Sequence, residues 1–160
     1  MTVHVRLTDA PFDPAAELAA LTAGHDDVGG LVTFTGLCRR DGDVLALELE
    51  AYPGFTETVI AAEARKVHDL HDLHHLHAVH RTGRVAPGEA IVFVAAAAAH
   101  RRAAFEGCDR LMDFLKSRAP FWKKEHSAAG ARWIEPRPQD YEDAARWDAR
   151  EPLSAPEDPR

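Results

Sequence analysis

The stretch AIVFVAAAAAHRRAAFEGCDRLMDFLKS, residues 90–117, decides the fold of this chain. Its first ten residues are all apolar, which predicts a buried strand with an unusually alanine-rich second half. Apolar residues then recur at helical spacing, which predicts a helix from about Arg101 to Ser117. The side chains expected to face inward from this helix are Phe105, Cys108, Leu111, Met112 and Leu115. Pro120 prevents the helix from continuing.

Further strands are predicted on both sides of this stretch, at residues 3–8, 31–35, 44–52, 75–81 and 131–135. Within 44–52, Leu45, Leu47 and Leu49 alternate with polar residues, which indicates a half-buried strand. Pro53-Gly54 ends that strand, and Pro87-Gly88 predicts a turn.

Three further helices are predicted. Asp13 is a good N-cap and Pro14 suits the first helical position, so a short helix begins there with Leu18 and Leu21 inward. A second helix runs to about Leu70 with one apolar stripe, formed by Ile60, Ala64 and Val67. A third is expected at residues 138–147. The irregular order of elements indicates one α+β domain over residues 1–150, with a flexible tail at 151–160.

Charge is distributed unevenly along the 160 residues. The net charge is −7, which argues against a protein that binds nucleic acid through a generally basic surface. Residues 100–126, however, carry 7 basic and 4 acidic side chains, so one basic segment lies within an acidic chain.

Membrane and secretory classes do not fit the sequence. The longest apolar run has ten residues, whereas a spanning helix needs about 20. The N-terminus has no basic start followed by an apolar stretch, so no secretory signal is expected. Cys38 and Cys108 are far apart in sequence, which argues against a disulfide framework or a thiolate zinc site and favours the cytoplasm.

Six histidines fall within thirteen residues, at positions 68, 71, 74, 75, 77 and 80. Histidines three apart on a helix can bind a metal, and His75 and His77 would share a strand face. The run nevertheless crosses a predicted helix–strand boundary, so the six cannot share one face. We interpret them as solvated or packing side chains, and we expect no metal site.

Two basic motifs are candidates for binding and catalysis. His100-Arg101-Arg102 lies where a strand meets a helix N-terminus, and free N–H groups with a guanidinium favour an anion there. The alternative is a solvated first turn.

KSRAPFWKKE, residues 116–125, places four cations around a proline. We expect Phe121 and Trp122 to pin this turn to the core, and crowding lowers the pKa of a lysine, which makes it a usable base or nucleophile. The alternative is a solvated helix end.

A third candidate is TGLCRRDG, residues 35–42, where a strand runs into a loop with arginines at its root. Cys38 could handle sulfur, but no clear activating base lies near it in sequence, so we interpret it as a bystander.

Together these motifs resemble the MoaE family, the large catalytic subunits of molybdopterin synthase. The resemblance runs through GGLVTFTGLCRR, LELEAYPGFTE and the long stretch from VHRTGRV to PFWKKE, and it ends at ARWIEP, roughly residues 29–136. It implies an α/β-hammerhead type of fold. It also implies conversion of a cyclic pyranopterin monophosphate into molybdopterin, with sulfur supplied by the C-terminal thiocarboxylate of a small ubiquitin-fold carrier. No permanently bound cofactor is implied.

The resemblance assigns roles to individual residues. Lys116 matches the lysine that meets the carrier tail, and Lys123 matches the second pocket lysine; both are the expected catalytic residues. The expected substrate contacts are these two lysines with Arg39, His100, Arg101, Lys124 and Glu125, and the loop backbone at Leu37 and Cys38. The implied assembly is a heterotetramer around a dimer of large subunits, so one pocket draws on both chains. No nucleic acid or membrane partner is expected.

Two other functions fit the same residues. A lysine with a lowered pKa beside an anion site would also serve a Schiff-base enzyme acting on a phosphorylated carbonyl compound. A non-catalytic module that only docks a ubiquitin-like tail would use the same basic segment.

Overall fold

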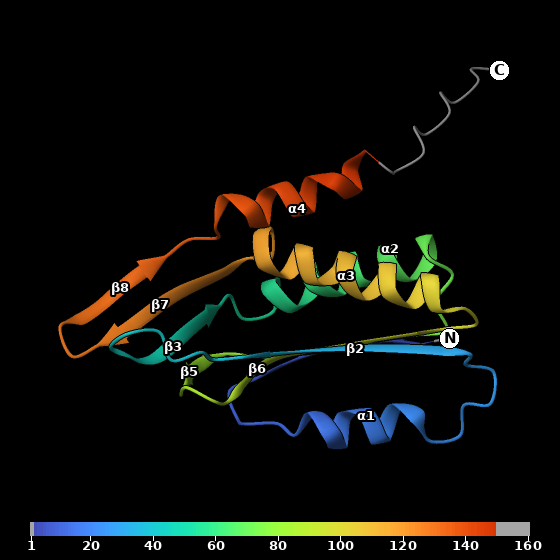
Figure 1. The fold of residues 1–160 in the computed structure, drawn as a ribbon, viewed down its shortest axis with the longest axis horizontal. Coiled ribbons are helices and arrows are strands. Elements are labelled where there is room, and N and C mark those ends of the chain that lie inside the picture. Colours follow the sequence, from blue (N-terminus) through green and yellow to red (C-terminus); the bar gives the residue numbers. More distant parts are fainter. Residues whose placement is uncertain (1, 150–160) are drawn as a thin grey trace.

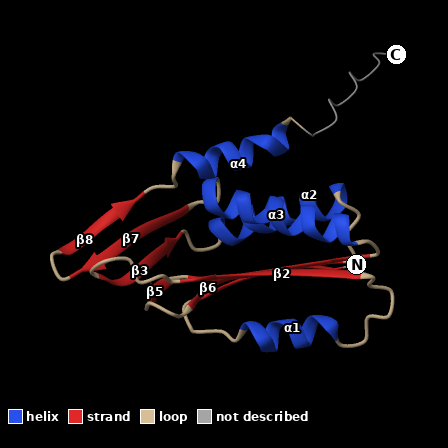
Figure 2. Cartoon of the chain, in the orientation of Figure 1, coloured by secondary structure: helices blue, strands red, loops and turns tan. Residues whose placement is uncertain are grey.

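A computed structural model describes residues 2–149 of the chain. It has two four-stranded sheets, with helices on both faces of the first sheet (Figures 1 and 2). The predicted α+β class is confirmed. The expected tail at 151–160 lies outside the described residues.

The first sheet is mixed and forms the long platform of the molecule. Its strands, in spatial order, are β1 (Thr2–Thr8), β4 (His75–Arg81), β6 (Ala90–Ala98) and β2 (Gly30–Leu37). β1 and β4 are parallel, and the other two pairings are antiparallel. β6 is central and buried over most of its length, as the apolar run predicts, whereas β2 is an edge strand.

The second sheet is antiparallel and extends from one end of the platform (Figure 1). Its strands, in spatial order, are β5 (Gly83–Val85), β3 (Val44–Ala51), β7 (Phe121–Ser127) and β8 (Gly130–Ile134). β5 and β7 were not predicted. β7 reads FWKKEHS, and it lacks the alternating apolar residues by which a half-buried strand is recognised.

Two helices, α2 (Phe55–Leu70) and α3 (Arg101–Ser117), cover one face of the first sheet, and α1 (Pro14–Thr22) covers the other (Figure 2). The main core lies between the sheet and α2–α3, and it contains the predicted stripe of Ile60, Ala64 and Val67. A smaller core under α1 contains Leu18 and Leu21. The Asp13 carboxylate accepts a hydrogen bond from the Ala15 N–H at 2.9 Å, which confirms the N-cap.

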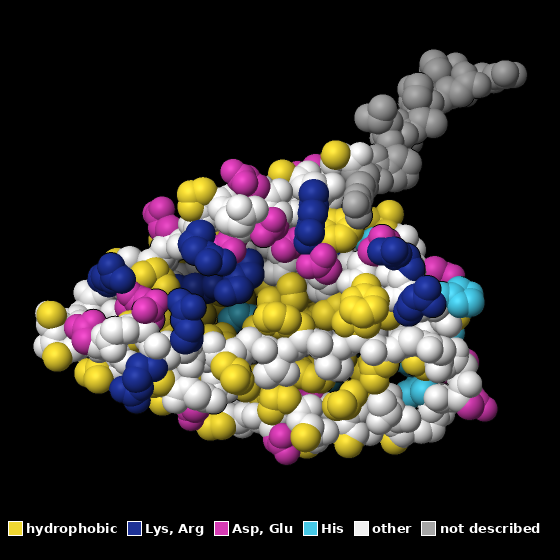
Figure 3. All heavy atoms as spheres, viewed as in Figure 1, with side chains coloured by type: hydrophobic (Ala, Val, Ile, Leu, Met, Phe, Trp, Pro, Cys, Tyr) yellow, Lys and Arg dark blue, Asp and Glu magenta, His cyan; other side chains and the backbone are white. Residues whose placement is uncertain are grey.

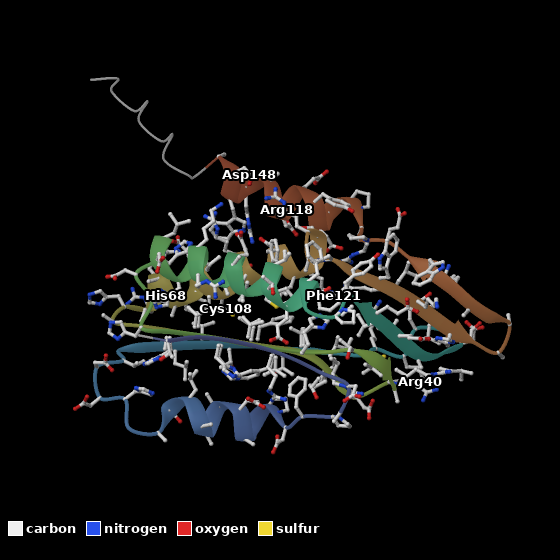
Figure 4. The ribbon with its side chains drawn as sticks, turned by 180° about the vertical axis from the view of Figure 1, so that it is seen from behind. Arg40, His68, Cys108, Arg118, Phe121 and Asp148 are labelled. Carbon is white, nitrogen blue, oxygen red and sulfur yellow. The ribbon has the colours of Figure 1, made fainter. Side chains whose placement is uncertain are left out.

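The fourth helix, α4 (Pro138–Asp148), packs on α3 through the buried Trp147. Arg118 just after α3 forms a bidentate ion pair with Asp148, with N–O distances of 3.0 and 2.6 Å (Figure 4). This pair joins the ends of the two helices.

Three predicted side-chain positions are wrong. Leu45 is 55% exposed, because a β-bulge between Val44 and Ala46 changes which side chains face the core. Phe105 is 58% exposed on α3, and Trp122 is 54% exposed on β7. Trp122 alternates with its half-buried neighbours on β7, so of the two aromatic side chains Phe121 is the one that packs against the core. Among the described residues, no helix is long and apolar enough to cross a membrane.

Candidate active site

A cavity of about 450 Å³ lies where the two sheets meet the C-terminal end of α3. The residues around it come from α3, from strands of both sheets (β2, β4 and β6 of the first, β3, β7 and β8 of the second), from the loop after β2 and from the segment that leads into α4. Figure 3 shows Lys and Arg side chains gathered around a hollow on this face. The cavity lining contains four Lys and Arg side chains and four Asp and Glu side chains, so the cavity is balanced in charge within an acidic chain.

Lys116 and Lys123 both line this cavity. Lys116 lies in the last turn of α3, and Lys123 is half-buried on β7 after the turn at Pro120. The buried Thr56 hydroxyl donates to the Pro120 carbonyl at 3.0 Å and so fixes that turn. Burial, followed by the nearby Lys116 charge, lowers the pKa of Lys123 to about 8. The predicted cation-crowded lysine is thus present, and it is Lys123.

His80 lies in the wall of the same cavity, although sequence reasoning grouped it with the histidine run. It is buried on β4, and burial lowers its pKa to about 3, so the ring is neutral near pH 7. Its Nδ1 is 2.8 Å from the Arg81 carbonyl. Because a carbonyl oxygen only accepts, Nδ1 carries the proton and Nε2 keeps its lone pair. The cavity therefore has an uncharged acceptor beside two lysines.

The rim of the cavity carries both signs of charge. Arg39 is exposed and pairs with Asp41 at 2.9 Å. Glu125 also lines the cavity and accepts from Arg132 Nε at 2.8 Å. Opposite them, Arg137 and Asp140 form a further pair at 3.3 Å, which sequence reasoning missed. Arg39 can turn to a ligand at little cost, because an exposed ion pair is weak.

Leu37 and Cys38 differ in their relation to the cavity. Leu37 is exposed and lines it. Cys38 is buried against Leu49 and Val85, and its backbone N–H donates to the Glu89 carbonyl at 2.8 Å. Burial raises the pKa of the Cys38 thiol, so the bystander interpretation agrees with its surroundings.

The structure does not bring Lys124 to the cavity. Side chains alternate along β7, so Lys123 and Glu125 face the cavity and Lys124 faces away. Lys124 Nζ instead donates to Glu50 at 2.9 Å and lies 4.1 Å from the ring centroid of Trp133.

His100 and Arg101 are exposed at the opposite end of α3 from Lys116. Lys116 lies fifteen positions after Arg101 in the helix, which corresponds to about 22 Å along its axis. At this end β2 begins close to the helix, since a Cβ on Gly30 would lie 3.0 Å from the Arg101 Cα. One chain alone therefore does not bring the expected phosphate contacts to its own lysine pair.

A groove runs along α3 between these two ends, with Arg102 and Lys116 both in its lining. We call its exposed aromatic part the β2–α3 strip: Phe34 on β2, 41% exposed, and Phe105 on α3, 58% exposed. Yellow apolar side chains form a band beside the hollow in Figure 3.

The remaining histidines do not form one site. His68 and His71 lie at the end of α2, where His68 pairs with Asp69 at 2.8 Å and His71 lies 3.7 Å from Glu106. His75 and His77 point to the opposite face of the sheet from His80, because side chains alternate along β4. The predicted helix–strand boundary within the run is confirmed.

Comparison with known proteins identifies the family of this chain. The model of the MoaE protein family matches residues 7–118. This chain belongs to the MoaE family. A MoaE relative from Caulobacter vibrioides, a molybdopterin synthase catalytic subunit, is 58% identical over 145 residues, which cover 90% of this chain and 97% of that protein.

Solved MoaE structures share the fold. The MoaE protein from Burkholderia ambifaria superposes with a TM-score of 0.78 at 41% identity, over 92% of this chain and 99% of that one. Molybdopterin synthase from Staphylococcus aureus gives a TM-score of 0.72 at 25% identity, over 80% of this chain and 94% of that one.

Proposed function

We propose that this MoaE chain is the catalytic subunit of a molybdopterin synthase. It would convert a cyclic pyranopterin monophosphate into molybdopterin, with sulfur from the C-terminal thiocarboxylate of a small ubiquitin-fold carrier. The observation that carries this proposal is the cavity in which Lys116 and Lys123 lie together, with the pKa of Lys123 lowered to about 8.

The carrier supplies the nucleophile in this reaction. Its thiocarboxylate sulfur forms a bond to a side-chain carbon of the substrate while a C–O bond at that carbon breaks, and the carrier is then held as an acyl thioester. The departing oxygen stays on the opened cyclic phosphate in one round and leaves as water in the other. Water hydrolyses that thioester, which leaves the sulfur on the substrate and releases the carrier with an ordinary carboxylate. Two such rounds give the dithiolene. The chain needs no thiol of its own, in keeping with the burial of both Cys38 and Cys108.

The two lysines have complementary tasks. Lys116, at the exposed mouth, stabilises negative charge that develops on the tail carbonyl. Lys123, half-buried with its lowered pKa, exchanges a proton with the reacting groups near neutral pH. The neutral His80 offers Nε2 as an acceptor to this pair and adds no charge to the cavity.

A second copy of the chain completes the site. In a twofold dimer the β2–α3 strip of one chain contacts the same strip of the other chain. If the two α3 helices cross antiparallel there, the N-terminal end of each helix lies beside the C-terminal end of the other. The partner's N-terminal end of α3 then approaches the cavity, and its His100 and Arg101 bind the substrate phosphate beside a helix N-terminus. With one carrier per pocket, the assembly is a heterotetramer.

The proposed reaction uses no permanently bound cofactor. We place it in the cytoplasm, since Cys38 and Cys108 are both free.

The decisive experiment mixes this chain with a thiocarboxylated carrier and the cyclic pyranopterin monophosphate, and then assays molybdopterin. Lys116→Ala and Lys123→Ala are expected to lose most product while still binding the carrier, whereas Lys66→Ala on α2 retains turnover. Lys124→Ala, one residue along β7 on the opposite face, is expected to lose much less than Lys123→Ala. Wild-type turnover in both lysine variants of the cavity contradicts the proposal.

The same assay separates the two other functions. The pKa of Lys123 near 8 also suits Schiff-base chemistry, and borohydride would then trap a carbonyl substrate on the chain. A module that only docks the tail would bind the carrier and form no dithiolene.

A further inference from the structure

A second cluster of potential ligands lies at the other end of β4 from His80, on the α1 side of the first sheet. His25 and Asp27, in the loop between α1 and β2, meet His75 at the start of β4. One ligand atom from each of the three side chains lies within 4.8 Å of the other two. The cavity of the proposed synthase does not use any of them.

His75 is already oriented as metal-binding histidines are. The residue is only 6% exposed, and its Nδ1 lies 2.9 Å from the Thr2 hydroxyl on the adjacent strand β1. A ligating imidazole almost always has its second nitrogen hydrogen-bonded to an oxygen, which orients the ring.

The other two ligands lie on an exposed loop. His25 and Asp27 are both exposed, and the His25 ring lies beside His75 with centroids 4.0 Å apart. Two nitrogen or oxygen donors on one tetrahedral Zn²⁺ lie about 3.4 Å apart, so the exposed loop must move closer to His75 to bring all three ligands onto one ion. A fourth side chain is close, because His74 Nδ1 lies 3.1 Å from an Asp27 carboxylate oxygen.

The alanine-rich half of β6 makes room for this cluster. Ala97 is the register partner of His75, and Ala95 is the partner of His77. Larger side chains at these two positions would fill the space beside the imidazoles on this face of the sheet.

We propose that His25, Asp27 and His75 bind one divalent transition-metal ion of the zinc class. Two imidazole nitrogens and one carboxylate oxygen form a ligand set that suits Zn²⁺ or Co²⁺, and water or His74 takes the fourth position. The bound ion links the loop before β2 to β4. Its role is structural, and the site is separate from the lysine cavity.

The test uses the full-length chain without an affinity tag, after chelator treatment. Co²⁺ is titrated and followed by its visible absorption, and Zn²⁺ is titrated by calorimetry. We expect one saturable site whose occupation raises the melting temperature, since a ligand that binds only the folded state stabilises it. The synthase assay without added metal is unaffected by His25→Gln or Asp27→Asn.

Matched variants decide the assignment. His25→Gln and Asp27→Asn change exposed residues, so they should fold, and each is expected to weaken Co²⁺ binding by about tenfold or more. Thr2→Val removes the oxygen that holds His75 and should weaken binding by a similar factor. The controls Asp26→Asn, in the same loop, and His68→Gln, in the same histidine run, should bind like the wild type.

Three results overturn the proposal. The first is the absence of saturable Co²⁺ or Zn²⁺ binding by the folded wild-type chain. The second is binding that survives in the double variant His25→Gln/Asp27→Asn. The third is binding that falls as much in the two controls as in the ligand variants.

Discussion

The imidazole of His80 lies face to face on the phenyl ring of Phe121, with centroids 4.2 Å apart and the ring planes 20° apart. His80 belongs to β4 of the first sheet and Phe121 begins β7 of the second, so this stack joins the two sheets beneath the cavity. The stack thus positions the strand that carries Lys123.

Substitutions at His80 should separate packing from hydrogen bonding. His80→Ala removes the stack and leaves a void, which is expected to lower the free energy of unfolding by roughly 2–4 kcal/mol. His80→Phe keeps an aromatic ring and loses mainly the bond to the Arg81 carbonyl, so the expected loss is roughly 1–2 kcal/mol. Urea denaturation, with the same dependence on denaturant concentration in both variants, measures whether His80→Ala loses more free energy of unfolding than His80→Phe. Equal losses in the two variants would show that the stack contributes nothing.

The protonation of Lys123 should respond to its two charged neighbours in opposite directions. A lysine is neutral above its pKa, so Lys123 becomes a base as the pH rises through about 8. Lys116→Gln removes a like charge and should raise that pKa, although burial, the larger cause, keeps it below 10.5. Asp140→Asn removes an anion that favours the charged form, and should lower it further.

Side-chain NMR of Cε-labelled lysine measures both titrations. The acid limb of the pH–rate profile should move with them, since the neutral form of Lys123 accepts the proton in the proposed reaction. A shift of both variants in the same direction would contradict the assignment.

Both thiols should be inert in the folded chain. Burial raises the pKa of Cys108 to about 12 and also raises that of Cys38, so few thiolates exist near pH 7. We expect iodoacetamide to leave both unmodified until the chain is denatured, as mass spectrometry can establish. Cys38→Ser should turn over almost like the wild type, and an inactive Cys38→Ser variant would indicate a persulfide route.

The β2–α3 strip should be the dimer contact. Phe34→Asp and Phe105→Asp each place a charge on that strip, and they are expected to convert a dimer into monomers in sedimentation equilibrium. Phe55→Asp is the matched control, because Phe55 is 56% exposed on α2, away from the strip. A dimer that persists in both strip variants would place the contact elsewhere.

Much of the fold was predictable because the spacing of apolar residues indicates which side of a helix or strand faces the core. The stripe of Ile60, Ala64 and Val67 and the apolar run of β6 each identify an element and its buried side. Periodicity was insufficient where the backbone departs from regularity, as at the bulge beside Leu45. It also could not distinguish Phe105, an exposed aromatic on a partly buried helix, from a core residue.

The site was only partly predictable for a different reason. Lys116, Lys123, Glu125, Arg39 and Leu37 do meet at one cavity, as the resemblance implied. His80, Arg137 and Asp140 were missed, because they join the cavity through the packing of two sheets and α4, which no local pattern encodes.

The proposed phosphate ligands and the lysines lie at opposite ends of α3, and this predicts that two inactive variants can complement each other. A chain with Lys116→Ala and a chain with His100→Ala/Arg101→Ala would each form an inactive homodimer. In the mixed dimer, one pocket carries every lesion and the other carries none, so mixing two dead proteins should restore activity. Such complementation is expected only for an enzyme whose single helix serves two different active sites.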